Sequence, residues 1–204
     1  MTKQKKRIVA LAASVVVLCI LALAIPLLLP LFEKAPSRRP INFADASLSL
    51  YPELDSEYMS LNRTIYFVKS GTTTIKTEMT EETYPQYSKA VRHIVKLIEA
   101  ALAGDSAAYN ACFSAEFIAA SGAYAPFTKQ KLYDIAIIEY STNAAVPEGY
   151  EKASLYGLAY KIKDNNGSLR TDIESDAELE QYLSVVEDCD GNVYIHGIQV
   201  IFKQ

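Results

Sequence analysis

The chain has 204 residues, of which 50% are hydrophobic, and its formal net charge is −4. The charge is unevenly distributed, because residues 45–204 hold 13 basic and 23 acidic side chains, a net charge of −10. An acidic domain repels phosphate backbones, so the composition argues against nucleic-acid binding. A segment of this length is large enough to form one domain with its own core.

An uncharged apolar run extends from Ile8 to Phe32 and follows a basic tip at residues 1–7. About 20 apolar residues cross the hydrocarbon core of a bilayer as a helix, so this run predicts a transmembrane anchor. The basic tip favours a cytoplasmic N-terminus. We therefore expect a single-pass protein of the cell membrane whose C-terminal domain is extracytoplasmic.

A cleaved secretory signal is the alternative interpretation, because Ala22-Leu23-Ala24 resembles a small-x-small cleavage site. Four leucines between positions 27 and 31 continue the apolar run past that site, which favours the uncleaved anchor. Residues 33–44 contain Pro36 and Pro40 and are expected to form a short, stiff linker. Residues 45–204 then make up the extracytoplasmic domain.

Two patterns open this domain. The segment Arg63–Met79 is rich in β-branched and aromatic residues around Ser70-Gly71, which predicts a hairpin. A helix is predicted over Tyr87–Leu102 and is expected to end at Gly104. Its apolar residues share one face at helical spacing and predict a core-facing stripe of Val91, Ile94, Val95, Ile98 and Leu102.

Shorter elements follow the long helix. Asp105 or Ser106 can cap a short helix through Cys112, Ser114 can cap another through Ala120, and Thr128 can cap a further turn near Tyr133. Asn166-Gly167 and Asp190-Gly191 are typical of tight hairpin turns. The predicted strands are Ile135–Ser141, Leu155–Lys163, Leu169–Glu174, Tyr182–Glu187 and Val193–Phe202. Helices segregated from a run of strands predict an α+β fold, with helices packed on a curved antiparallel sheet.

The junction Gly104-Asp105 after a long helix, followed by Tyr109, Phe113 and a meander of long strands, resembles the NTF2-like (cystatin-like, cone-shaped) fold. The resemblance covers about residues 87–204, whereas the preceding hairpin departs from the usual order of that fold. The chain is also similar to membrane-anchored extracytoplasmic proteins of Gram-positive bacteria. The resemblance implies isomerases, ligand binders or subunits of secretion machines as relatives, and so leaves the function open.

No pattern in the chain predicts a cofactor or a metal site. A Gly-rich phosphate loop, zinc-ligand spacing and a nucleophile elbow are all missing from the sequence. Asp188, Asp190 and Asn192 resemble the start of a calcium loop, but Gly191 falls too early and no glutamate closes the loop, so a tight turn is favoured. The acidic residues between Glu174 and Glu180 are interpreted as a solvated connection, with weak cation binding as the alternative.

Cys112 and Cys189 lie in the domain, and either a disulfide or two free thiols fits the sequence. His93 and His196 are the two histidines, and a general base at His196 is conceivable. The cone of an NTF2-like fold can enclose a pocket, and strand residues could line it, although core filling is the alternative use of the tyrosines. The candidate ligand-binding residues are Tyr140, Tyr156, Tyr160, Tyr182 and His196.

These observations favour a non-catalytic scaffold at the cell envelope that binds a protein partner or a small ligand. The chain lacks any recognisable catalytic constellation, so no catalytic residue is assigned. An NTF2-like isomerase or hydrolase that uses a pocket histidine or aspartate is the alternative function. A pocket holding a carboxylate or histidine with a shifted pKa would favour this alternative.

Overall fold

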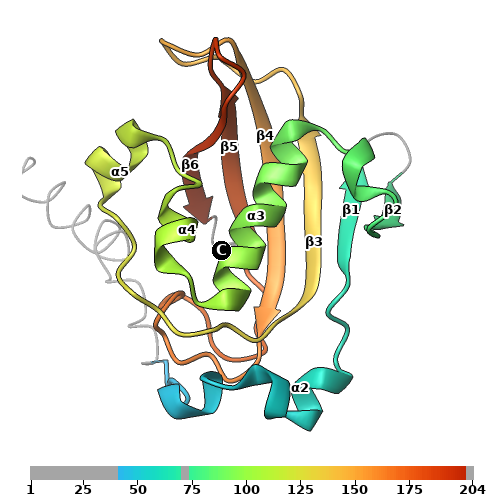
Figure 1. Ribbon diagram of the computed structural model, residues 1–204, viewed down its shortest axis with the longest axis vertical. Helices are drawn as coiled ribbons and strands as arrows, with labels where there is room; N and C mark the ends of the chain where they lie inside the picture. The colour runs from blue at the N-terminus through green and yellow to red at the C-terminus, as the bar shows by residue number, and fades with distance from the viewer. Residues whose placement is uncertain (1–40, 70–73, 201–204) are drawn as a thin grey trace, which may run out of the picture. The chain divides into compact units, whose positions relative to one another are not determined.

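A computed structural model of the protein describes residues 41–69 and 74–200. They belong to one compact unit, residues 41–204, with an α+β architecture built on a six-stranded sheet (Figure 1). The predicted anchor, Ile8–Phe32, lies outside the described residues. In the two described ranges, no helix combines the length and the apolar character needed to cross a membrane.

The sheet joins the predicted hairpin to the C-terminal strands in the order β2-β1-β3-β4-β5-β6. The hairpin strand β1 pairs in parallel with β3, and every other neighbouring pair is antiparallel. The hairpin therefore extends the main sheet instead of forming a separate layer. The strands are β1 (Ile65–Lys69), β2 (Ile75–Glu78), β3 (Leu132–Ser141), β4 (Lys152–Ile162), β5 (Gln181–Glu187) and β6 (Val193–Val200).

The long helix α3 (Lys89–Ala103) confirms the predicted helix and its end at Gly104, while its start lies two residues after the predicted Tyr87. The hydroxyl of Ser88 accepts the backbone N–H of Val91 at the start, and Gly104 adopts a left-handed conformation at the end. Two short helices follow it, α4 (Ser106–Asn110) and α5 (Ala115–Ser121), capped by Asp105 and Ser114. The N-terminal segment contributes η1 (Ala46–Ser49), η2 (Pro52–Leu54) and α2 (Ser56–Ser60), and η3 (Tyr84–Gln86) precedes α3.

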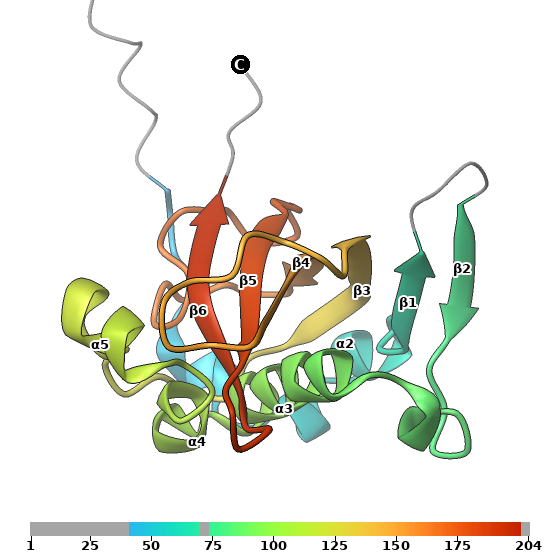
Figure 2. The same cartoon turned by 90° about the horizontal axis from the view of Figure 1, so that it is seen from above.

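The core lies between α3 and one face of the sheet. Figure 2 shows α3 and α4 lying along that face. The predicted stripe residues Val91, Ile94, Val95 and Ile98 are buried, and Leu102 packs at the margin of the core. They contact strand residues that are also almost fully buried. These strand residues alternate along each strand, because successive side chains of a strand point to opposite faces of the sheet. These strand residues are Ile135, Ile137, Leu158, Leu183, Val185 and Ile195.

Two sequence predictions for the elements are wrong. No helical turn follows Thr128, because the chain runs extended from there into β3. The predicted strand Leu169–Glu174 is part of the loop that joins β4 to β5, so Asn166-Gly167 does not close a hairpin. Leu169 and Ile173 are nevertheless buried, because this loop folds back onto the core.

Candidate functional site

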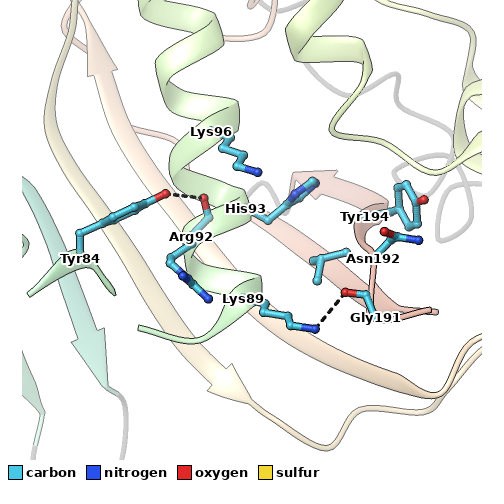
Figure 3. Close-up of a pocket in the computed structure, with 9 residues that line it drawn as sticks. Tyr84, Lys89, Arg92, His93, Lys96, Gly191, Asn192 and Tyr194 are labelled. Atoms are coloured by element: carbon cyan, nitrogen blue, oxygen red, sulfur yellow. Dashed lines mark hydrogen bonds between the residues drawn. The ribbon is translucent and has the colours of Figure 1, made fainter. Parts of the chain in front are cut away.

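A basic cleft lies between the N-terminal half of α3 and the turn that joins β5 to β6 (Figure 3). It encloses a volume of about 480 Å³. Helix α3 supplies one wall, the β5–β6 turn and the start of β6 supply the other, and Tyr84 of η3 closes one end. The lining residues are Tyr84, Lys89, Arg92, His93, Lys96, Gly191, Asn192, Val193 and Tyr194.

The helix wall of this cleft is basic because of residue spacing. Lys89, Arg92, His93 and Lys96 stand at positions i, i+3, i+4 and i+7, which fall on one face of a helix. The stripe of Val91, Ile94, Val95 and Ile98 holds the adjacent face against the sheet. Packing of the core therefore turns the basic face toward the β5–β6 turn.

The turn wall is held in place by hydrogen bonds within the turn. One carboxylate oxygen of Asp188 accepts the backbone N–H groups of Asp190 at 3.0 Å and Asn192 at 2.8 Å, and Gly191 has a positive φ of 78°. The second oxygen accepts the amide of Asn192 at 3.0 Å. Asp188 is thus occupied by its own turn, which confirms the tight-turn interpretation over the calcium loop.

The two walls are joined by Lys89. Its ammonium group donates to the carbonyl of Gly191 at 3.0 Å, drawn in Figure 3, and to a carboxylate oxygen of Glu187 at 3.1 Å. Lys152 pairs with the other oxygen of that carboxylate at 3.2 Å. Glu187 therefore serves two ammonium groups and balances the charge of Lys89 only in part, and the role of Lys89 in the cleft is to fix the turn against the helix.

Arg92 and Lys96 carry charges that have no acidic counterpart among the described residues. The Nε atom of Arg92 is buried and lacks a hydrogen-bond partner in the described part of the chain. A buried donor without a partner is costly, and such atoms are rare in folded proteins. The cleft thus offers an unpaired guanidinium and an unpaired ammonium within a domain of net charge −10.

His93 adds a titratable donor to the same wall. Its Nε2 atom lies 2.8 Å from the carbonyl oxygen of Cys112, so this nitrogen carries the proton and donates. Burial lowers the pKa of His93, the hydrogen bond to Cys112 opposes that effect, and the charge of Lys96 adds to the lowering. His93 is therefore neutral at neutral pH and gains charge only in acid.

This arrangement is suited to holding an anion. Arginine and lysine bind carboxylates and phosphates by charge-assisted hydrogen bonds, and arginine can do so with two parallel donors. Asn192 and Tyr194 are the polar residues of the opposite wall. A nucleophile beside a base, the usual signature of covalent catalysis, is missing from the lining residues.

The tyrosines predicted to line a pocket lie on opposite faces of the sheet. Tyr156 and Tyr160 point into the core and are almost fully buried. The hydroxyl of Tyr160 lies 3.1 Å from a side-chain oxygen of Gln181 and accepts from Arg170 at 3.3 Å. Tyr156 also borders a second hollow of about 430 Å³, which adjoins the basic cleft at Lys89.

Tyr140 and Tyr182 stack on the other face of the sheet, with ring centroids 5.5 Å apart. The hydroxyl of Tyr140 donates to a carboxylate oxygen of Glu180 at 2.6 Å. Gly157 lies beneath this group, and a Cβ atom there would collide with Tyr140 and Glu180. Tyr140 and Glu180 therefore cover Gly157 and shield this part of β4 from solvent.

His196 lies apart from the basic cleft. Its Nδ1 atom is 3.0 Å from the hydroxyl oxygen of Ser114, and its ring meets Tyr150 edge-on at 5.1 Å. The hydroxyl of Ser114 also accepts the backbone N–H of Phe117 at the start of α5. Since Ser114 is buried and caps a helix, this contact joins α5 to β6.

The remaining candidates are accounted for by local structure. Glu174, Asp176 and Glu178 are exposed in the β4–β5 loop, as the solvated interpretation predicts, whereas Glu180 is half-buried beside Tyr140. Across the described residues, no group of three or more histidine, cysteine or acidic side chains is placed to hold a metal ion. Cys112 is a free, buried thiol and Cys189 a free, exposed one, and burial raises the pKa of Cys112 to about 11.

Sequence reasoning missed the basic cleft, although the sequence contained a signal for it. The spacing of Lys89, Arg92, His93 and Lys96 on one helix face was visible, and it stands out against the acidic composition. Comparison with protein-family models, with curated proteins and with solved structures found no match to this chain. We therefore infer the function from the geometry of the cleft.

Proposed function

We propose that the chain is a single-pass membrane protein whose extracytoplasmic domain binds an anionic ligand or an anionic group of a partner. In this proposal the domain acts as a non-catalytic scaffold at the cell envelope. The bound group is a carboxylate or a phosphate held in the basic cleft. The run Ile8–Phe32 provides the anchor.

The observation that carries the proposal is the unpaired charge in the cleft. Lys89 has an acidic partner in Glu187, which it shares with Lys152, whereas Arg92 and Lys96 have no acidic partner among the described residues. In the same part of the chain, the buried Nε atom of Arg92 has no acceptor. Unpaired cations at adjacent turns of one helix repel each other, which destabilises the empty protein. An anion between them would remove the repulsion and satisfy the buried donor.

We also propose that the domain is a variant of the NTF2-like fold. Support comes from the long helix α3, the junction Gly104-Asp105 into α4, and the antiparallel strands β3 to β6. The hairpin β1–β2 is then an addition at the edge next to β3. This assignment would group the chain with a fold that hosts both binding proteins and enzymes.

One observation favours an enzyme as the second candidate. His93 lines the same cleft as Arg92, and burial lowers the pKa of His93, which favours its neutral form. A neutral imidazole next to an anion site could accept a proton from a bound acid. In this alternative the base would be His93, whereas the sequence had pointed to His196.

Titration calorimetry of the purified full chain with pyrophosphate tests the binding proposal. The parent is expected to bind, and Lys96→Ala is expected to bind about tenfold more weakly, since a charge-assisted hydrogen bond contributes roughly 1.5 kcal/mol or more. Lys96 is exposed, so the variant should fold normally. Lys69→Ala removes the same charge from β1, outside the cleft, and should leave the affinity unchanged.

If Lys96→Ala and Lys69→Ala reduced the affinity for pyrophosphate equally, binding would depend only on the net charge of the protein. This result would contradict a binding site in the cleft. Failure of the parent to bind pyrophosphate, together with failure to bind a tricarboxylate, would contradict anion binding itself. His93→Gln separates the two functions. The scaffold retains its binding and host phenotype in this variant, whereas an enzyme that uses His93 as a base loses turnover while still binding.

A further inference from the structure

An exposed apolar patch occupies the first described segment of the domain. Of the nine large apolar side chains exposed among the described residues, six fall between Phe43 and Met59. Four of them lie within seven consecutive positions, with exposed fractions of 57% for Leu48, 45% for Leu50, 60% for Tyr51 and 78% for Leu54. We call these four residues the N-terminal apolar patch. Clustered exposure of this kind is typical of an interaction surface.

The exposure of the patch does not arise from a loosely held backbone. The backbone N–H of Ala44 donates to the carbonyl of Asn165 at 2.9 Å, and the carboxylate of Asp55 accepts the ammonium of Lys131 at 2.7 Å. The hydroxyl of Tyr58 donates to the carbonyl of Leu132 at 3.0 Å. The segment is thus fastened to the β4–β5 loop and to the start of β3, while the four side chains of the patch stay exposed.

The sequence before the patch indicates what covers it. The apolar run ends at Phe32, and ten residues, 33–42, separate it from Phe43, so eleven chain steps join the two. An extended chain advances at most about 3.6 Å per residue, so this tether reaches roughly 40 Å at its longest. Lys34, Arg38 and Arg39 lie in that tether, and basic juxtamembrane residues are attracted to anionic headgroups. The tether therefore keeps the patch near any bilayer that holds the run.

We propose that the N-terminal apolar patch rests on the bilayer surface, with Leu48, Leu50 and Leu54 inserted among the lipids. This inference rests on the proposed membrane anchor. A tyrosine such as Tyr51, with an apolar ring and a polar hydroxyl, suits the level of the headgroups. Asp45, Glu53 and Glu57 lie beside the patch, so apolar insertion drives the contact and the acidic domain adds no attraction to anionic lipid.

The contact would also orient the domain. Pro52 and Met59 share a groove with Leu102 and Ala103, at the C-terminal end of α3. The basic cleft lies on the N-terminal half of the same helix, which has 15 residues and is therefore about 22 Å long. Figure 1 shows the N-terminal segment and the β5–β6 turn at opposite ends of the domain. Docking through the patch turns the cleft away from the bilayer.

The chain contains no tryptophan, so a single introduced tryptophan reports its own surroundings. We would reconstitute the full chain carrying Leu54→Trp into vesicles of dioleoyl phosphatidylcholine and phosphatidylglycerol, with and without bromine on the acyl chains. Bromine quenches a tryptophan that lies among the lipids. The expected result is a blue-shifted emission and roughly a twofold loss of intensity in brominated vesicles, since the side chain is immersed at the acyl boundary.

Val146→Trp is the matched control, because Val146 is exposed on the β3–β4 connection. The backbone N–H of Glu151 in that connection donates to the carbonyl of Glu187, which places it at the end of the domain that holds the β5–β6 turn. This tryptophan should show solvent-like emission without quenching. Tyr51→Trp is a second reporter in the patch and should be quenched like Leu54→Trp.

Each outcome separates the docking from the proposed anchor. A chain that floats with the vesicles but shows no quenching at position 54 or 51 overturns the docking and leaves the anchor intact. A blue shift without quenching shows that protein covers the patch, from the same chain or a second copy, and also overturns it. If Val146→Trp is quenched as strongly as Leu54→Trp, the proposed orientation of the domain on the bilayer is wrong. A chain that does not float overturns both the anchor and the docking.

Discussion

At the scale of single residues, a buried lysine joins three segments of the domain. Lys131 has only 2% of its side chain exposed, and its ammonium lies 2.7 Å from Asp55 and 2.8 Å from Asp164. Asp55 caps α2, and Asp164 opens the β4–β5 loop. Each carboxylate keeps some contact with water. We therefore expect the three charges together to contribute more to stability than a surface ion pair, and to be less desolvated than a fully buried one.

We predict that Lys131→Met destabilises the domain by about 2 kcal/mol, because it removes the buried cation that two carboxylates share and leaves Asp164 with the more distant Lys163, at 3.7 Å. For a domain of this size, the melting temperature should then fall by roughly 4–8 °C. Circular dichroism melts of the parent and the variant measure the change. Lys129→Met removes an exposed neighbouring lysine that lies 3.8 Å from Glu53, and should shift the melt by less than about 2 °C.

The pH dependence of the same melts supplies a second readout. The hydrogen bond from Lys131, followed by the backbone N–H of Tyr58, lowers the pKa of Asp55. A carboxylate with a lowered folded-state pKa contributes stability above about pH 4, its unfolded-state value, and this stability is lost as the pH falls through the folded-state pKa. The parent should therefore lose stability in acid more steeply than Lys131→Met, and parallel curves would contradict this role for the ion pair.

At the scale of elements, the helix α3 serves both the core and the site. Its apolar stripe packs on the sheet, and its basic face lines the cleft. Any change that rotates or unfolds the helix therefore alters the core and the anion site together. Variants of the basic face must be checked for folding before a loss of binding is assigned to lost contacts.

We predict that Ile98→Asp unfolds the domain. Ile98 is 1% exposed, and an unpaired buried carboxylate costs on the order of 5 kcal/mol, comparable to the whole stability of a typical domain. The far-ultraviolet spectrum and a thermal melt measure the effect. Glu99→Ala changes the next, exposed residue of the same helix and should retain a cooperative melt. A melt of Ile98→Asp within about 2 °C of the parent would mean that the stripe is not core.

The elements that could be predicted from sequence are those that local chemistry specifies. Gly104 marks the end of α3 because capping acts within a few residues, and Asp190-Gly191 turns directly between two adjacent strands. Asn166-Gly167 carries the same signal, but it lies in the long β4–β5 loop. There the buried side chain of Asn165 donates to the carbonyl of Arg170 within the loop, and the side chain of Arg170 donates to the hydroxyl of Tyr160 in β4. The hairpin signal reveals neither contact.

The candidate site was less predictable than the fold. The strand tyrosines suggested a pocket because alternation places aromatic residues on a face, yet alternation does not say whether that face is hollow or filled. Tyr156 and Tyr160 fill the core. The basic cleft needs the β5–β6 turn to fold against α3 through Lys89 and the carbonyl of Gly191, a contact between residues about a hundred positions apart. Only the charge spacing on the helix was available beforehand.

At the scale of the whole molecule, the two ends of the sequence have opposite charge. Residues 1–44 hold seven basic side chains and one acidic one, whereas residues 45–204 carry a net charge of −10. Basic residues near an apolar segment are retained on the cytoplasmic side more readily than acidic ones. The tip at residues 1–7 has four basic residues, and the linker has three, so the charge bias toward a cytoplasmic N-terminus is small but has a definite direction.

We predict that protease added to intact protoplasts of the native host degrades residues 45–204 and leaves a membrane-bound N-terminal fragment. The apolar run Ile8–Phe32 is longer than the 7–15 residues of a signal-peptide core, so it should remain attached and hold the domain outside the cytoplasm. Epitope tags at the two ends, followed by immunoblotting, distinguish the products, and lysed protoplasts control for protease access. A soluble product that begins near Ile25 would identify a cleaved signal, and a C-terminal tag protected until lysis would reverse the topology. Cleavage would remove the tether that brings the N-terminal apolar patch to the bilayer, whereas reversed topology would keep the tether and place the patch on the cytoplasmic leaflet. The anion site on α3 would remain in both cases, because it depends only on contacts within the folded domain.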